Sequence, residues 1–182
     1  DQVNYGLGFP WPTVGDNDFS LQLIHEGLDN DLGGAWRSAR PTPGYRNAVT
    51  TGTAPPLLRH VDISPSQPRT GDRVLVTTKI TDSAGVATTI LQYQIVTPGN
   101  YWVQTSAAFA TNWISIPMHD DGLDGDQAPR DDVYTAQIPE TVQQHRRLIR
   151  YRIACTNSIG LGVRVPYSDD PSPNFAYFVY DG

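Results

Sequence analysis

Cysteine is almost absent from this chain of 182 residues, and the single one, Cys155, excludes an internal disulfide. Alternate residues of a strand point to the same face, so Ile149, Tyr151, Ile153 and Cys155 would share one side of the segment 148–155. We therefore expect Cys155 to be buried as a small hydrophobic side chain. No cysteine and histidine stand at a recognisable spacing, which argues against a catalytic thiol.

Lysine is equally scarce, since Lys79 is the only one, and the formal net charge is −6. The densest group of basic side chains consists of Arg146, Arg147, Arg150 and Arg152. We interpret these arginines as a solvated strand face. A nucleic-acid surface needs a basic stripe, so no nucleic-acid partner is expected. No apolar run approaches the length of a membrane span, so membrane insertion is not expected.

No stretch keeps a helical periodicity, while 16 glycines and 15 prolines interrupt the chain. This composition is typical of short strands joined by turns and predicts an all-β fold. Residues 1–47 contain one alternating run, 19–24, after a turn signal at Asp16-Asn17-Asp18, and residues 48–56 form a linker rich in Thr, Gly and Pro. The polar segment 139–147 is expected to be a turn. From residue 57 to residue 182 we expect about eight strands of a two-sheet sandwich, at 58–63, 73–81, 88–96, 112–118, 133–138, 148–155, 162–166 and 174–180.

The segment 119–132 is an acidic, glycine-spaced loop directly before an expected strand. Glycine at positions 122 and 125 lets the backbone turn tightly, so that Asp120, Asp124 and Asp126 would converge. Converging carboxylates are how a hard cation collects oxygen ligands, and this predicts a calcium site. The candidate ligands are the six carboxylates of the loop: Asp120, Asp121, Asp124, Asp126, Asp131 and Asp132.

A second interpretation of the same loop stays open. Aspartate and glycine are also the ordinary residues of solvated hairpin turns, where Asp side chains accept hydrogen bonds from their own backbone. The spacing departs from the EF-hand pattern, which has a glutamate at its twelfth position. The loop is therefore either a calcium site or an acidic turn in water.

Catalytic residues are not predicted anywhere in the chain. The four histidines, His25, His60, His119 and His145, have no local motif around them, and the crowded carboxylates of one turn do not suit glycoside hydrolysis. Exposed rings bind sugars by stacking, and Tyr101 with Trp102, after the turn 98–100, is the weak candidate for a ligand-binding pair.

Two parts of the sequence resemble known families. In the second part, the stretches concerned are the acidic loop with 134–136, the strand 147–152, the strand and turn 151–160, and the terminal 174–182. Together they resemble an immunoglobulin or fibronectin-III type module that lies before the kinase-like domain in large secreted bacterial proteins of the CotH type. In the first part, the stretches are 1–5, 10–12, 19–24, Asp29-Asn30, Trp36, 42–44 and Asn47. They resemble the closing segment of a lamin-tail domain.

These resemblances imply a section of a longer extracellular or cell-surface protein, and we expect a processed product or an excised piece because the chain starts at Asp1. The kinase-like signatures themselves do not occur in the sequence. The expected function is a non-catalytic structural, assembly or adhesion module of a bacterial protein. Its partners would be other domains of a parent chain or copies of itself, joined through β-edges, and the run 19–24 is expected to pair with or pack on the sandwich. The alternatives are a carbohydrate-binding module and an accessory domain of a CotH-type kinase.

Overall fold

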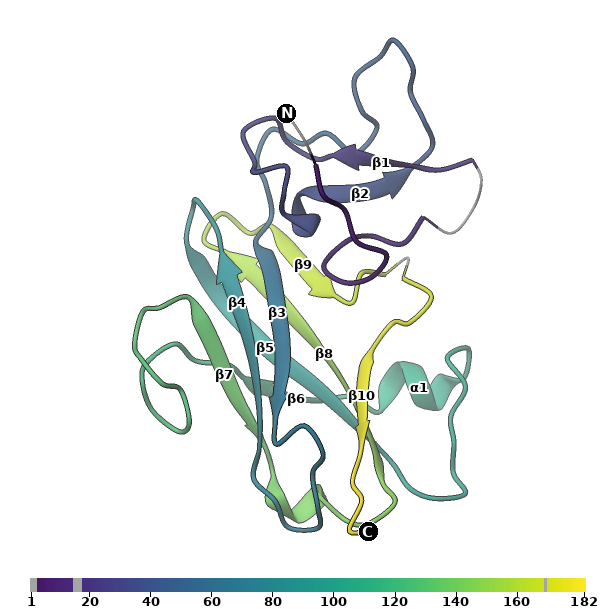
Figure 1. The fold of residues 1–182 in the computed structure, drawn as a ribbon, viewed down its shortest axis with the longest axis vertical. Coiled ribbons are helices and arrows are strands. Elements are labelled where there is room, and N and C mark those ends of the chain that lie inside the picture. Colours follow the sequence, from purple (N-terminus) through teal and green to yellow (C-terminus); the bar gives the residue numbers. More distant parts are fainter. Residues whose placement is uncertain (1–2, 15–17, 169) are drawn as a thin grey trace.

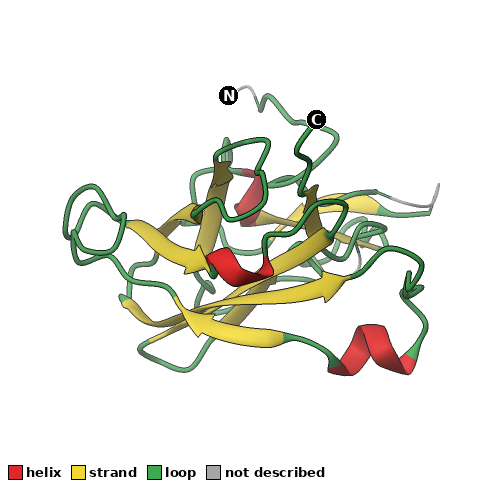
Figure 2. Cartoon of the chain, turned by 90° about the horizontal axis from the view of Figure 1, so that it is seen from below, coloured by secondary structure: helices red, strands yellow, loops and turns green. Residues whose placement is uncertain are grey.

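The computed structural model describes residues 3–14, 18–168 and 170–182 (Figure 1). Strands form the body of the molecule and the helical segments are short (Figure 2). The turn signal at Asp16 and Asn17, and the chain start at Asp1, lie outside the described residues. The prediction of an all-β sandwich is confirmed.

Two antiparallel sheets make up the sandwich. The larger sheet has the order β10 (Phe175–Phe178), β8 (Leu148–Asn157), β5 (Val86–Val96) and β6 (Ile114–Pro117), and β9 (Gly162–Val165) also pairs with β8. The smaller sheet has the order β3 (Leu57–Ser64), β4 (Val74–Thr81) and β7 (Val133–Ile138). These elements fall on the segments that alternation predicted, because one face of each strand must be apolar to cover the opposite sheet.

The core lies between the sheets and follows the period of two. On β4, Val74, Val76 and Ile80 are buried while the alternate residues are partly exposed. On β8, Ile149 and Ile153 have no exposed surface, and Tyr151 and Cys155 are buried on the same face. Each of these strands therefore contributes one apolar stripe to a shared interior.

The N-terminal part forms a small sheet of its own. β1 (Ser20–Leu23) pairs in antiparallel fashion with β2 (Trp36–Ala39), so the run 19–24 pairs with β2 and not with a strand of the sandwich. A 3-10 turn, η1 (Gly33–Ala35), precedes β2 and is buried. Figure 1 shows β1 and β2 at one end of the sandwich, near β3 and β9.

Two short helical segments lie in loops of the sandwich. The expected turn 139–147 contains the 3-10 turn η2 (Glu140–Val142). One α-helical turn, α1 (Ala107–Thr111), was not predicted from the sequence. It is held at its start by the Ser106 hydroxyl, which accepts a hydrogen bond from the Phe109 N–H at 3.2 Å. Five residues are too few to show a helical period, so sequence pattern does not reveal such a turn.

Cys155 is 2% exposed, as its place in the alternation predicted. Burial raises the pKa of its thiol to about 11. Because only the thiolate is nucleophilic, we expect iodoacetamide at pH 8 to modify the folded protein at least about 100-fold more slowly than the unfolded chain. Intact-mass spectrometry with and without urea measures this difference. Equal rates in the two conditions would contradict the buried position.

Candidate functional site

The acidic loop 119–132 carries the chain from the larger sheet to the smaller one, between β6 and β7. At its start, the backbones of His119 and Thr135 exchange two hydrogen bonds, of 2.9 and 2.8 Å. At its end, the Asp132 carbonyl accepts a hydrogen bond from the Ile80 N–H at 2.8 Å. Both ends of the loop are therefore held on the smaller sheet, and the residues between them project beside β7 (Figure 1).

Two glycines give the loop its tight path. Gly122 has a φ of +73° and Gly125 a φ of +108°, in the left-handed region that favours glycine. A Cβ added at Gly122 would lie 2.8 Å from the Pro129 Cδ, and one added at Gly125 would lie 2.7 Å from the Leu75 Cδ1. Close packing on both sides therefore requires glycine at these positions.

Three of the six candidate carboxylates converge. One oxygen each from Asp120, Asp126 and Asp131 lies within 4.8 Å of the other two. Within the described parts of the chain, this is the one group of three or more His, Cys, Asp or Glu side chains close enough to share a metal ion. The loop thus brings together one residue from its start, one from its middle and one from its end.

Backbone N–H groups hold two of these carboxylates in place. Asp120 accepts from the Asp131 N–H at 3.1 Å with one oxygen and from the Asp132 N–H at 3.0 Å with the other. Asp131 accepts from the Val133 N–H at 2.9 Å. The two ends of the loop are therefore joined through the Asp120 side chain, and both carboxylates have fixed positions.

Asp126 is the buried member of the group, with 7% of its surface exposed. Its Oδ2 accepts a hydrogen bond of 2.6 Å from the Gly122 N–H. Its Oδ1 is fully shielded from solvent and has no hydrogen-bond partner. A buried charged oxygen without a partner is unfavourable by several kcal/mol in general, so this atom calls for a compensating positive group.

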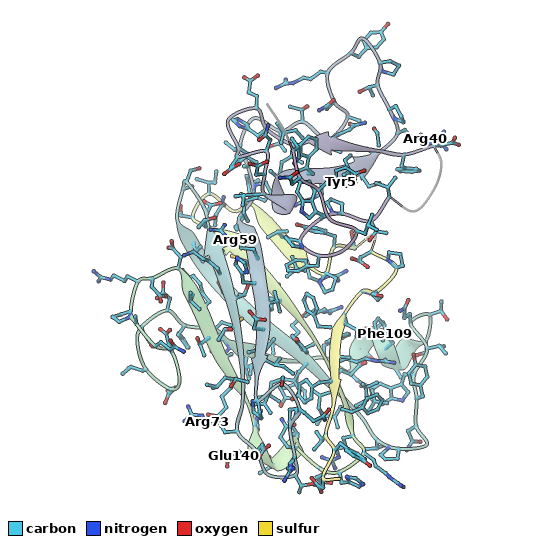
Figure 3. All side chains as sticks on the ribbon, in the orientation of Figure 1. Tyr5, Arg40, Arg59, Arg73, Phe109 and Glu140 are labelled. Atoms are coloured by element: carbon cyan, nitrogen blue, oxygen red, sulfur yellow. The ribbon has the colours of Figure 1, made fainter. Side chains whose placement is uncertain are left out.

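The other three candidate carboxylates lie outside the converging group. Asp121 accepts a hydrogen bond from the Leu123 N–H at 3.0 Å, as in a solvated turn. Asp124 is exposed with a φ of +52°, and its carbonyl accepts from the guanidinium of Arg73, which extends toward the loop from the start of β4 (Figure 3). Asp132 is exposed and contributes its carbonyl to β4.

The two aromatic residues chosen as a ligand-binding pair differ in exposure. Tyr101 is 67% exposed, whereas Trp102 is partly buried. Both are tied to Arg150: its guanidinium lies 4.8 Å from the centre of the Tyr101 ring and donates to the Trp102 carbonyl at 2.9 Å. The structure thus presents one exposed ring at this position, backed by a cation.

The interpretation of the arginines at 146–152 as a solvated face is wrong for Arg150, which is 3% exposed. Its guanidinium donates to the Gln94 Oε1 at 3.3 Å and lies 5.3 Å from the ring of Phe109, which belongs to α1 (Figure 3). Gln94, with no exposed surface, donates in turn to the carbonyls of Ala108 and Phe109. The helical turn therefore covers this part of the outer face of the larger sheet.

Arg152, two positions further along β8, is partly covered as well. Its guanidinium lies 4.0 Å from the centre of the Trp113 ring, and its Nε donates to the Gln92 Oε1 at 2.7 Å. Burial, and second the positive charge of Arg164, lower the pKa of Arg152 to about 10. The residues that cover these arginines belong to the segment 101–113 before β6, which is rich in aromatic side chains. That richness could be seen in the sequence, but the position of the segment over the sheet is set only by the fold.

No protein-family model matches this chain, and no curated protein matches it significantly. Function must therefore be inferred from the molecule itself.

The histidines occupy separate places. His25 accepts a hydrogen bond from the Gly27 N–H through its Nδ1 at 3.0 Å. The Nδ1 of His145 lies 3.8 Å from the Asp181 carboxylate, and its ring centre lies 5.3 Å from that of Tyr180. His119 is at the start of the acidic loop, and His60 lies within β3.

In the described residues, no helix is long and apolar enough to cross a membrane.

Proposed function

We propose that this chain is a non-catalytic structural module of a bacterial surface or secreted protein, where it serves as an assembly or adhesion unit. The observation that carries the proposal is the joint between the N-terminal part and the sandwich. In this proposal the joint holds the two parts as one rigid unit, as a spacer requires.

Aromatic side chains build the joint. The Phe9 ring lies 5.3 Å from the Phe175 ring and 6.4 Å from the Tyr167 ring. The hydroxyl of Tyr167 donates to the Pro10 carbonyl at 3.3 Å, and the guanidinium of Arg37 lies 4.2 Å from the centre of the Tyr167 ring. Tyr167, 5% exposed, thus contacts both the N-terminal loop and β2.

The backbone also comes close at this joint. A Cβ added at Gly34 would lie 3.3 Å from the Leu57 Cδ2 and 3.6 Å from the Tyr167 hydroxyl, so η1 packs directly on the start of β3. Closely packed protein interiors transmit strain from one side to the other. The module is therefore suited to hold neighbouring parts of a protein at a fixed distance and angle.

Edges of the two sheets give the module a means of assembly. β6 is the last strand of the larger sheet, and its residue Ile114 is 46% exposed. An edge strand offers unpaired N–H and C=O groups to a strand of another chain. We include copies of the same module, and other domains of a parent chain, among the proposed partners. Light scattering over a range of concentrations measures the self-association directly.

Replacing Tyr167 with alanine is expected to uncouple the two parts. The loss of its ring contacts should convert one cooperative thermal transition into two, and should make the linker 48–56 cleavable by a protease at temperatures below the main transition. Calorimetry and limited proteolysis measure these effects. The control is Tyr180→Ala, since Tyr180 is 53% exposed and lies two residues before the C-terminus, at the opposite end of the molecule from the N-terminal part (Figure 1). A Tyr167→Ala protein that melts in one transition like the control would contradict the rigid unit.

Carbohydrate binding is the second candidate function, and the exposed ring of Tyr101 favours it. A ring backed by the Arg150 guanidinium is held flat for stacking against a sugar. A glycan array with the wild-type protein and with Tyr101→Ala separates the two functions. Binding that is lost in Tyr101→Ala would replace the structural proposal with the carbohydrate-binding one.

A further inference from the structure

The orphan carboxylate oxygen of Asp126 marks the acidic loop as more than a charged turn. In a solvated turn, each carboxylate oxygen meets water or a backbone N–H. Asp121 accepts a backbone N–H, whereas Asp126 Oδ1 is shielded from solvent and accepts no hydrogen bond from the protein, at a residue that is 93% buried. One oxygen of Asp126 lies within 4.8 Å of one oxygen each of Asp120 and Asp131, and these carboxylates would repel one another unless a cation lies between them.

No basic side chain of the protein supplies that cation. Within the described ranges, the one ion pair joins His145 to Asp181, far from the loop in sequence. Arg73 donates to the carbonyl of Asp124, and neither Arg73 nor Arg130, which belongs to the loop, forms an ion pair with the three carboxylates. A cation from outside the chain would supply the compensating charge.

We propose that Asp120, Asp126 and Asp131 bind one calcium ion, which closes the loop between β6 and β7. The spacing fits the ion: ligand oxygens lie about 2.3–2.6 Å from Ca²⁺, so oxygens on opposite sides of one ion are separated by about 4.6–5.2 Å. The three carboxylate oxygens lie within 4.8 Å of one another and so fit into one coordination sphere. An all-oxygen, carboxylate-rich set on a loop is the chemistry that calcium selects, whereas zinc and copper favour nitrogen and sulfur.

The bound ion links three points of the loop. Two residues separate Asp120 from the end of β6, and one separates Asp131 from the start of β7. Asp126 lies on the segment that packs on Leu75 through Gly125. The ion thus joins the place where the chain leaves the larger sheet to the place where it enters the smaller one. This inference does not depend on the proposed structural function, because a module of any function gains stability from an ion that binds only its folded state.

The experiment measures calcium binding and thermal stability together, by isothermal titration calorimetry and by thermal unfolding of the whole chain. We expect calcium at about 100 times its dissociation constant to raise the melting temperature by roughly 5–10 °C. Sodium chloride at equal ionic strength serves as the control for screening, and magnesium for ion selectivity. A wild-type protein without binding heat and without a melting shift would overturn the inference and leave an acidic turn in water.

Two matched variants test the assignment of the ligands. Asp126→Asn should abolish the calcium-dependent shift, while Asp124→Asn, which removes the same charge from an exposed position of the same loop, should retain it. If Asp126→Asn does not fold, the exposed ligand variant Asp131→Asn takes its place, and a loss of the shift there supports the site. A shift that survives in the ligand variant, or that disappears equally in Asp124→Asn, would overturn the three-carboxylate assignment.

Discussion

Replacing Ile153 with alanine is expected to lower the free energy of unfolding by about 2–5 kcal/mol. Ile153 has no exposed surface and lies in the middle of β8, paired with Leu91 on one side and with Val165 on the other. Removing three methyl or methylene carbons there leaves a cavity that the paired strands on both sides cannot close. Urea unfolding, followed by fluorescence, measures the change as a shift in midpoint with an unchanged slope.

The control for this substitution is Ile159→Ala in the turn after β8. Ile159 is 56% exposed, so its replacement should alter the free energy of unfolding by less than about 0.5 kcal/mol. A similar small effect at Ile153 would show that β8 does not carry the centre of the core.

Replacing Arg150 with leucine is expected to destabilise the protein by about 2–4 kcal/mol and to release α1 from the larger sheet. The substitution removes the guanidinium that donates hydrogen bonds to the Trp102 carbonyl and to the Gln94 Oε1. It also removes the contacts of that guanidinium with the rings of Tyr101 and Phe109. Hydrogen exchange measures the local part of this effect. We expect the protection of the α1 amides to fall further than that of the β4 amides.

Arg46→Leu is the control for the loss of one positive charge, since Arg46 is exposed in the N-terminal part. It should leave both the unfolding midpoint and the α1 amides as in the wild type. Unchanged exchange of α1 in Arg150→Leu would mean that other contacts hold the helical turn on the sheet.

The strands could be predicted from the sequence because their signal is local. On β4 the buried residues follow the period of two, and on β8 the apolar residues from Ile149 to Cys155 do so. A strand that covers a core on one face has few other ways to arrange its apolar residues. The burial of Cys155 followed from the same alternation. For this reason the all-β sandwich could be inferred without any knowledge of how the strands pair.

The outer face of the larger sheet could not be predicted in this way. Arg150 alternates with buried residues and so has the pattern of a solvated side chain, yet residues 101–113 fold back over it. Burial of a polar residue on an outer face depends on a loop that is distant along the chain, and alternation carries no information about it. The helical turn α1, which forms that cover, is too short to leave a pattern of its own.

The structure of the acidic loop could be predicted only in part. The glycine positions and the abundance of carboxylates predict a tight turn that gathers oxygens, and the backbone angles of Gly122 and Gly125 agree with such a turn. Which carboxylates meet is decided by the return of the chain, which brings Asp131 back to Asp120 across eleven positions. The sequence predicted that Asp124 would converge with Asp120 and Asp126, whereas the third member of the group is Asp131. The path of the loop depends on the packing of Gly125 against Leu75, a tertiary contact that sequence spacing does not reveal.

The position of the chain ends has a mechanical consequence. The N-terminal part and the C-terminus lie at opposite ends of the long axis, and β10 runs toward the C-terminal end beside β8 (Figure 1). Tension applied between these ends pulls β10 along its own direction, and its hydrogen bonds to β8 are perpendicular to that direction. They are therefore strained together in shear, so the sandwich resists extension as a single clamp instead of opening one bond at a time.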